Sequence, residues 1–203
     1  MKIAIIGAAG NVGQRLVSEA LARGHEVTAI GPTRARLEAL ASVRVSPASL
    51  DDPDGLAAAL SGHDVVLSSV RFVRFKPESL LSAVAASRVP RLAVVGGAGS
   101  LTSPAGGLVM DGPNFPEAAL AEARAGGAVL DALRGSSGID WTFLSPSAVF
   151  SAGARTGEFR LGHDELLVDG NGKSHISYED FAVAMLDEIE DSKHSGQRFT
   201  VGY

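Results

Sequence analysis

The sequence contains no cysteine among its 203 residues. This absence excludes disulfide bonds and thiolate metal sites, and it is typical of a reducing compartment such as the cytoplasm. Positive charge is also scarce, because 18 Lys and Arg stand against 23 Asp and Glu and give a net charge of −5. A chain with this balance has no bulk basic surface for nucleic acid.

Long apolar runs are missing as well. No segment approaches the roughly 20 apolar residues that a membrane helix requires. The first apolar run, IAIIGAAG, is short, is broken by glycine and lacks the basic start of a signal peptide. We therefore expect a cytoplasmic protein that has neither a membrane nor a nucleic acid as its partner.

What is present is a regular alternation of short apolar runs with helical patterns. The predicted strands are Lys2–Ile6, Glu26–Ile30, Val43–Val45, Asp64–Ser69, Arg91–Val95 and Trp141–Leu144. The predicted helices are Val12–Arg23, Arg34–Leu40, Asp54–Leu60, Glu78–Ser87 and Glu117–Leu133. Continuously apolar strands are typical of a parallel sheet that is buried on both faces. The alternation predicts an α/β fold with a doubly wound parallel sheet.

The last third of the chain is less regular. Residues 147–177 are rich in Gly and Ser, with short apolar runs at 166–168 and 175–176, and we expect loops and small strands there. Ser177 is the predicted N-cap of a helix, with Asp180 in the place of the capping-box acid. QRFTVGY closes the chain as a last strand. We expect one domain, 1–203, whose irregular part at about 147–177 lies on the substrate side.

The stretch GAAGNVG follows the first predicted strand and opens the first predicted helix. In that context Gly7 allows a tight turn, Gly10 lets a pyrophosphate approach the backbone, and Gly13 lets the helix pack on the strand. The free N–H groups at the helix start then face the anion. A Rossmann-type dinucleotide loop is predicted, with a ligand-free glycine turn as the alternative. No Gly-Lys-Ser/Thr ends the loop, which excludes a P-loop.

The end of the second predicted strand reads TAIGPTRAR and carries no acid. Nicotinamide sites that take NAD place an Asp or Glu there for the ribose 2′-hydroxyl. Arg34 and Arg36 follow instead, and Arg34 could pair with the 2′-phosphate of NADP. NADP is therefore the expected coenzyme, with NAD as the alternative. The competing interpretation is that both arginines are solvated surface residues.

Taken together, these motifs resemble those of a known family. GAAGNVG, GHDVVLSS, VVGGAGSL, GIDWTFLSP, RTGEFRLG, SHISYEDFAVAMLDEIE and RFTVGY are the shared stretches. The sequence resembles the atypical short-chain dehydrogenase/reductase group across the whole chain. Within that group it is most similar to the small NmrA-like NAD(P)H-binding proteins, which are often labelled NADH-flavin reductase or NAD-dependent epimerase/dehydratase.

The resemblance implies an NAD(P)-binding Rossmann fold and a set of coenzyme contacts. The implied pyrophosphate contacts are Gly7, Ala9, Gly10, Asn11 and Val12. Arg34 is implied near the ribose phosphate, and Ser49 and Leu50 beside the adenine. The implied contacts toward the nicotinamide are Ser68, Ser69, Val70, Gly96, Gly97, Ala98, Ser145, Pro146 and Ser147. These residues follow the carboxyl ends of predicted strands, where open α/β sheets bind ligands.

The proton donor of ordinary short-chain dehydrogenases is missing. Those enzymes use Tyr-x-x-x-Lys, but the helix that should carry the pair reads FPEAALAEARAGGAVLDAL, and the only tyrosines are Tyr178 and Tyr203. Hydride transfer to a flavin or quinone demands less, because the protein need only orient two rings while solvent supplies the proton. We therefore expect a reductase of a small conjugated acceptor. A non-catalytic NADP(H)-sensing protein and a sugar-nucleotide epimerase or dehydratase are the alternatives.

Few polar residues are candidates for direct chemistry. Ser100 follows the fifth predicted strand, where it could bond a substrate carbonyl, and His175 could donate a proton at neutral pH. A structural role is the alternative for both. Residues 163–165 read His-Asp-Glu, but adjacent side chains cannot converge on one ion, so no metal is expected. The basic and aromatic stretch VRFVRFK should border the site. It could stack a flavin, or it could face a second subunit in a homodimer.

Overall fold

The computed structural model describes residues 1–203 and shows one eight-stranded sheet in the order β3-β2-β1-β4-β5-β6-β10-β8. Every pair in it is parallel except β10 with β8, which is antiparallel. The strands are β1 Lys2–Ile6, β2 Glu26–Gly31, β3 Arg44–Pro47, β4 Val65–Ser68, β5 Arg91–Val95, β6 Asp140–Pro146, β8 Arg160–Gly162 and β10 Gln197–Gly202. The doubly wound α/β prediction is confirmed.

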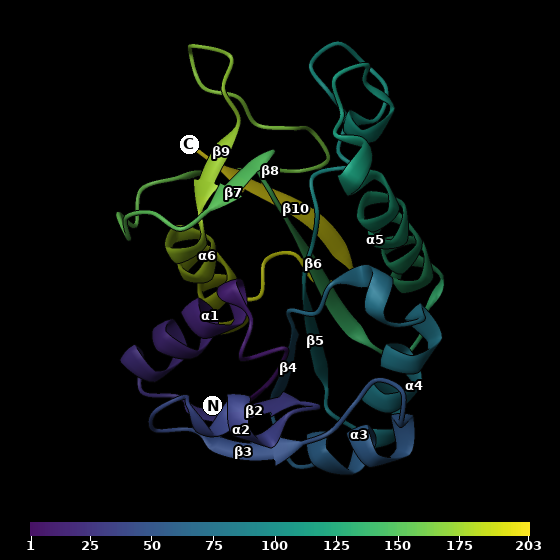
Figure 1. Ribbon diagram of the computed structural model, residues 1–203, viewed down its shortest axis with the longest axis vertical. Coiled ribbons are helices and arrows are strands. Elements are labelled where there is room, and N and C mark those ends of the chain that lie inside the picture. The colour runs from purple at the N-terminus through teal and green to yellow at the C-terminus, as the bar shows by residue number, and fades with distance from the viewer.

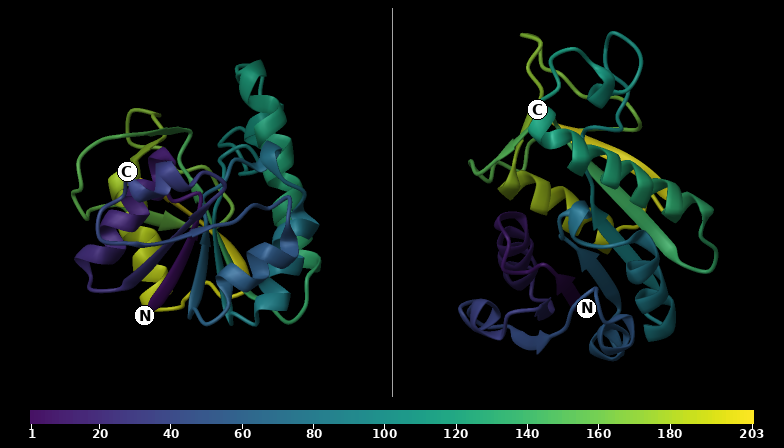
Figure 2. Two further views of the ribbon diagram at one scale, coloured as in Figure 1. Left: turned by 60° about the horizontal axis from the view of Figure 1, so that its bottom comes forward. Right: turned by 45° about the vertical axis from the view of Figure 1, so that its right-hand side comes forward.

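Helices cover both faces of this sheet (Figures 1 and 2). They are α1 Asn11–Ala22, α2 Arg34–Glu38, α3 Pro53–Leu60, α4 Pro77–Ser87, α5 Glu117–Gly135 and α6 Tyr178–Glu190. Short 3₁₀ turns, η1 Phe72–Arg74 and η2 Val109–Asp111, precede α4 and α5. None of these helices is both long and apolar enough to cross a membrane.

The sheet has an apolar core on each face, because successive side chains of a strand point to opposite faces. One core packs α1, α2 and α6 on the first face, with Leu16 and Phe181 fully buried in it. The other packs α3, α4 and α5 on the second face, with Leu60 and Phe143 fully buried. Successive strand residues point to opposite faces, so a strand that feeds both cores must be apolar throughout. This is why the strands read as continuous apolar runs.

The elements predicted up to residue 144 are all present, with ends that agree within two residues. The C-terminal part was only partly predicted. Residues 175–177 form β9, which pairs in parallel with β7 Val149–Ser151. Residues 166–168, expected as a small strand, form none, and β8 was not predicted. These strands have three residues each, too few for a sequence period to show.

Ser177 caps α6 as predicted, since its hydroxyl accepts a hydrogen bond of 2.9 Å from the Asp180 backbone N–H. The capping box itself is wrong, because the Asp180 carboxylate does not turn back to Ser177. It accepts hydrogen bonds from the N–H groups of Thr156 and Gly157, both at 2.8 Å. The hydroxyls of Thr156 and Tyr203 complete the set at 2.6 Å each. Asp180 therefore ties the loop before β8 and the end of the chain to α6.

We predict that Asp180→Asn lowers the free energy of unfolding by about 2–4 kcal/mol, because an amide has one accepting oxygen where the carboxylate has two, and its NH2 group would face donors. Burial raises the pKa of Asp180, but the hydrogen bonds from Thr156, Tyr203 and Gly157 outweigh burial and lower it. A lowered pKa makes this stabilisation present above about pH 4 and lost as the pH falls further.

Urea unfolding at several pH values measures both effects. The variant should lose less stability than the wild type on acidification. Asp191→Asn, on an exposed pair with Lys193, is the control and should change stability by less than about 0.5 kcal/mol. Equal stability of wild type and Asp180→Asn would contradict the assignment.

Candidate functional site

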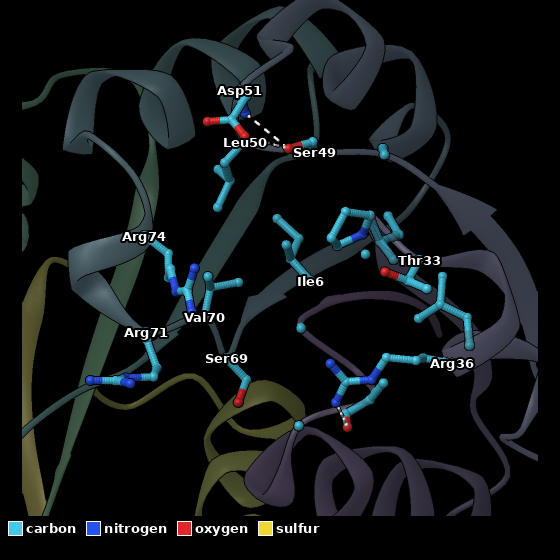
Figure 3. Close-up of a pocket in the computed structure, with 18 residues that line it drawn as sticks. Ile6, Thr33, Arg36, Ser49, Leu50, Asp51, Ser69, Val70, Arg71 and Arg74 are labelled. Atoms are coloured by element: carbon cyan, nitrogen blue, oxygen red, sulfur yellow. Dashed lines mark hydrogen bonds between the residues drawn. The ribbon is translucent and has the colours of Figure 1, made fainter.

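Two cavities open where the parallel strands end at their carboxyl side. The first has a volume of about 490 Å³ and lies over β1, β2 and β4 (Figure 3). The chain leaves β1 in one direction to β2 and returns to its other side as β4, so the strand order reverses at this point. Such a reversal separates neighbouring loops and is the usual ligand site of an open α/β sheet.

The glycine loop forms the floor of the first cavity. Gly7 has a φ of +82°, and its N–H bonds the Ile30 carbonyl at 2.9 Å. Gly10 is the N-cap of α1, with no side chain capping the helix and no acid in the first turn. The N–H groups of Asn11, Val12 and Gly13 donate no hydrogen bond within the protein. An anion at this helix start would meet unpaired donors and the positive end of the helix dipole.

Space in this loop admits only glycine at two positions. A Cβ at Gly7 would lie 2.5 Å from the Ser69 carbonyl oxygen. A Cβ at Gly13 would fall far inside van der Waals contact with the Gly7 carbonyl oxygen, and 2.9 Å from the Ala8 backbone. The close approach of α1 to β1 is the geometry a pyrophosphate cradle requires, so the residues present fit a dinucleotide.

The end of β2 carries no carboxylate, and the two arginines that follow it lie differently relative to the cavity. Arg34 pairs with Glu38 at 3.3 Å, leaves 62% of its side chain exposed and does not line the cavity. Arg36 lines it, and its guanidinium reaches the Ala9 carbonyl at 3.4 Å. Residues two apart on a helix face different directions, so only one could turn inward. Arg36 and Thr33 therefore line the cavity, and Arg34 does not.

The remaining walls come from the loops after β3 and β4. Ser49, Leu50 and Asp51 line one side, with the Ser49 hydroxyl donating to Asp51 at 3.1 Å. Ser69, Val70, Arg71 and Arg74 line the side opposite Arg36 (Figure 3). The VRFVRFK stretch thus borders the site, but Phe72 within it is buried and stacks on Phe143 at 6.0 Å. Phe72 is a core residue and does not line the first cavity.

The second cavity has a volume of about 270 Å³ and lies after β5, beneath α5. The turn Gly96–Ser100 forms one side, so Gly96, Gly97, Ala98 and Ser100 all line it. α5 contributes Ala119, Glu122, Ala123 and Gly126, and Phe72, Phe115, Pro116 and Ala148 complete the lining. Glu122 accepts a hydrogen bond of 2.6 Å from the Phe72 N–H, which fixes η1 between the two cavities.

Two glycines where α5 meets its neighbours leave no room for a side chain. A Cβ on Gly99 would lie 2.5 Å from the Ala123 Cβ, and one on Gly126 would lie 2.9 Å from the Phe72 ring. The lining of the second cavity includes no Tyr, Lys or His. The two tyrosines lie elsewhere, since Tyr178 packs edge-on against Phe150 and the hydroxyl of Tyr203 bonds Asp180.

The two candidates for direct chemistry are separated. Ser100 lines the second cavity, but its hydroxyl and its carbonyl both accept hydrogen bonds from Arg198, at 3.2 and 2.9 Å. His175 lies in β9, outside both cavities, with its ring 4.9 Å from the Tyr203 ring and its Nδ1 buried without a partner. Nothing in the structure gives His175 a path to a ligand in either cavity.

Other expected contacts lie around the cavities rather than on their surfaces. Asn11, Val12 and Gly13 contribute the helix start, while Ser68, Ser145, Pro146 and Ser147 are buried at the ends of β4 and β6. The Ser147 hydroxyl donates to the Val201 carbonyl at 3.0 Å. Sequence reasoning missed Thr33 and Asp51, and it named Glu122 only as part of the helix. Their side-chain directions depend on contacts between distant segments.

We predict that Gly13→Ala abolishes dinucleotide binding, because its methyl group must displace either Gly7 or the start of α1. Gly127→Ala on α5 is the matched control, since a Cβ there meets nothing within 4 Å. Alanine is the better helix former by about 1 kcal/mol, so the control should bind normally and melt no lower than the wild type. Calorimetric titration with reduced coenzyme and thermal melting measure both; unimpaired binding by Gly13→Ala would refute the cradle.

Comparison with known proteins gives the family. A family model described as NAD(P)H-binding matches residues 7–192. The uncharacterised protein YwnB of Bacillus subtilis is 38% identical over 208 residues, which cover 99% of this chain and 98% of YwnB.

Two similar solved structures carry different provisional names. One, from Bacteroides thetaiotaomicron, is provisionally named an epimerase; it is 40% identical with a TM-score of 0.92 and covers 100% of this chain and 96% of its own. Another, from Streptococcus pneumoniae, is provisionally named an NADH-flavin reductase; it is 32% identical with a TM-score of 0.84 and covers 100% and 99%. The family match agrees with the glycine loop, whose N–H groups at the start of α1 donate no hydrogen bond within the protein. The chain belongs to the NAD(P)H-binding family.

Proposed function

We propose that the protein is an NAD(P)H-dependent reductase that passes hydride to a small conjugated acceptor such as a flavin or a quinone. The observation that carries this proposal is the pairing of a complete dinucleotide cradle with a second, adjoining cavity that contains no Tyr, Lys or His. Bound coenzyme supplies a hydride donor. A conjugated acceptor needs orientation and exclusion of side reactions more than it needs a protein acid.

Different elements of the chain would bind the coenzyme and the acceptor. The N–H groups that open α1 bind the pyrophosphate, and the loops after β3 and β4 enclose the adenosine end. The Gly96–Ser100 turn and α5 shape the space for the acceptor, and solvent supplies the proton that completes reduction. Glu122 is the only titratable side chain in that space, and its carboxylate is engaged by the Phe72 N–H.

NADP is the proposed coenzyme, with Arg36 and Thr33 in place of Arg34 as partners of the 2′-phosphate. Arg36 has no carboxylate partner, whereas Arg34 is paired with Glu38. An acid that would repel the phosphate is missing at the end of β2. We place the reaction in the cytoplasm, and a homodimer remains part of the proposal, with the exposed side chain of Val73 next to the site as a candidate contact.

A sensor that binds NADP(H) without turnover is the second candidate, and the absence of Tyr, Lys and His from the lining of the second cavity favours it. An epimerase or dehydratase is disfavoured, because its proton transfers need a donor where α5 presents Ala119, Ala123 and Gly126. The provisional name of the Bacteroides relative therefore does not carry over to this chain.

Turnover is tested by mixing the protein with NADPH and riboflavin, FMN or a quinone, and following absorbance of the reduced nicotinamide. We expect oxidation of NADPH that depends on both protein and acceptor and that Gly13→Ala abolishes. Tight NADPH binding with no turnover across a broad acceptor panel would refute the reductase. A difference in affinity between NADPH and NADP would then favour the sensor, because a ligand shifts states only through differential affinity.

We predict that Arg36→Ala weakens NADPH binding by about tenfold or more and leaves NADH binding within about twofold, because only NADPH carries the 2′-phosphate. Arg34→Ala is the matched control and should change neither affinity, since Arg34 lies outside the cavity. Titration of each variant with both coenzymes measures the effect. Equal losses for NADPH and NADH, or a larger loss from Arg34→Ala, would overturn the assignment of Arg36.

A further inference from the structure

The turn after β5 holds a row of unused hydrogen-bond donors. The backbone N–H groups of Gly97, Ala98, Gly99 and Ser100 donate no hydrogen bond within the protein. All four residues line the second cavity. Buried or half-buried N–H groups are nearly always paired, so a run of four without partners indicates a place where an oxygen atom is bound. Successive N–H groups in a turn form the concave kind of site that takes a negatively polarised oxygen.

The charged groups around the second cavity disfavour the binding of a ligand that carries a net negative charge. No Lys, Arg or His lines it, and Glu122 is its only charged residue. The Glu122 carboxylate is held by the N–H groups of Phe72 and Val73, at 2.6 and 3.4 Å. Its one ionic partner, Arg71, lies 3.5 Å away with most of its side chain in solvent, so the pair is weak. A phosphate or sulfonate entering this space would lose water and find no cation.

The volume of the second cavity further limits which ligands can bind there. Pockets for drug-sized ligands usually measure about 300–1,000 Å³, and this one measures about 270 Å³. Its lining is mainly glycine, alanine, proline and phenylalanine, which suits a flat apolar body. Arg36, Arg71 and Arg74 line the first cavity, and no arginine lines the second.

We propose that the second cavity binds an uncharged quinone of one or two rings, with one carbonyl oxygen on the N–H groups of Gly97–Ser100. This inference rests on the proposed function and narrows its acceptor. The quinone takes up one hydride, which is two electrons and one proton, and one further proton from solvent; it becomes the hydroquinone while NAD(P)H becomes NAD(P)⁺. The N–H row stabilises the oxygen that turns negative before solvent protonates it, the task that Tyr performs in ordinary dehydrogenases.

The first experiment measures binding without coenzyme. Isotope-labelled wild-type protein is titrated with naphthoquinone and with naphthoquinone sulfonate while backbone amide resonances are recorded. We expect shifts centred on residues 97–100 with the uncharged compound, and an affinity at least about tenfold lower for the sulfonate. Shifts that avoid this turn, or equal or tighter binding of the sulfonate, would overturn the inference.

The second experiment tests the source of the discrimination. Glu122→Gln removes the charge but keeps an oxygen that can accept from the Phe72 N–H, and thermal melting checks that it folds. We expect its preference for the uncharged quinone to fall at least about threefold, in binding and in kcat/KM. Glu117→Gln, an exposed acid on the same helix with no ion pair, is the control and should keep the full preference. An unchanged preference in Glu122→Gln would refute the role of Glu122.

The two proposals fail in different ways. If naphthoquinone binds at residues 97–100 but NADPH is never oxidised, the assignment of the cavity stands and the reductase proposal falls. If NADPH is oxidised by FMN at least as fast as by naphthoquinone, the reductase stands and the inference about an uncharged acceptor falls.

Discussion

The close contact between α1 and the carboxyl ends of β1 and β4 is the constraint on which the site depends. Gly13 rests on the Gly7 carbonyl, and Gly7 rests on the Ser69 carbonyl, with no space for a side chain at either position. This contact fixes the direction of α1, and with it the direction of the unpaired N–H groups at its start. Because the helix also packs on α6 through the first core, the loop is held from both sides. A ligand-binding loop supported in this way is preorganised, so little ordering remains to be done when the ligand binds.

A similar close approach shapes the second cavity on the other side of the sheet. α5 comes so near the turn after β5 that a Cβ on Gly99 would lie 2.5 Å from the Ala123 Cβ, so Gly99 admits no side chain. The lining of that cavity includes no Tyr, Lys or His. Its polar groups are the Glu122 carboxylate, the Ser100 hydroxyl and the backbone N–H groups of residues 97–100, which donate no hydrogen bond within the protein. In the proposed reductase these fixed N–H dipoles, with solvent as the source of the proton, take the place of a protein acid.

The features that could be predicted from the sequence are those set by neighbouring residues. Strand and helix order followed from apolar periodicity, and the glycine loop followed from spacing. The sequence favoured Arg34, whereas Arg36 lines the cavity, because the outcome depends on how a helix of five residues is rotated against the cavity. The capping box at Asp180 failed because Thr156, Gly157 and Tyr203, all more than 20 positions away, compete for the same carboxylate. The sequence could not show that Ser100 lines a cavity while His175 does not, because the position of His175 depends on the path of residues 147–177.

The two cavities are not mechanically independent, because η1 is the wall between them. Arg71 and Arg74 face the first cavity, Phe72 between them faces the second, and Glu122 holds the turn through the Phe72 N–H. Phe72 also fills the space above Gly126 and stacks on Phe143, so it has little freedom to move alone. A ligand in either cavity would therefore lie against the same short turn, with the arginines on one side of it and Phe72 on the other.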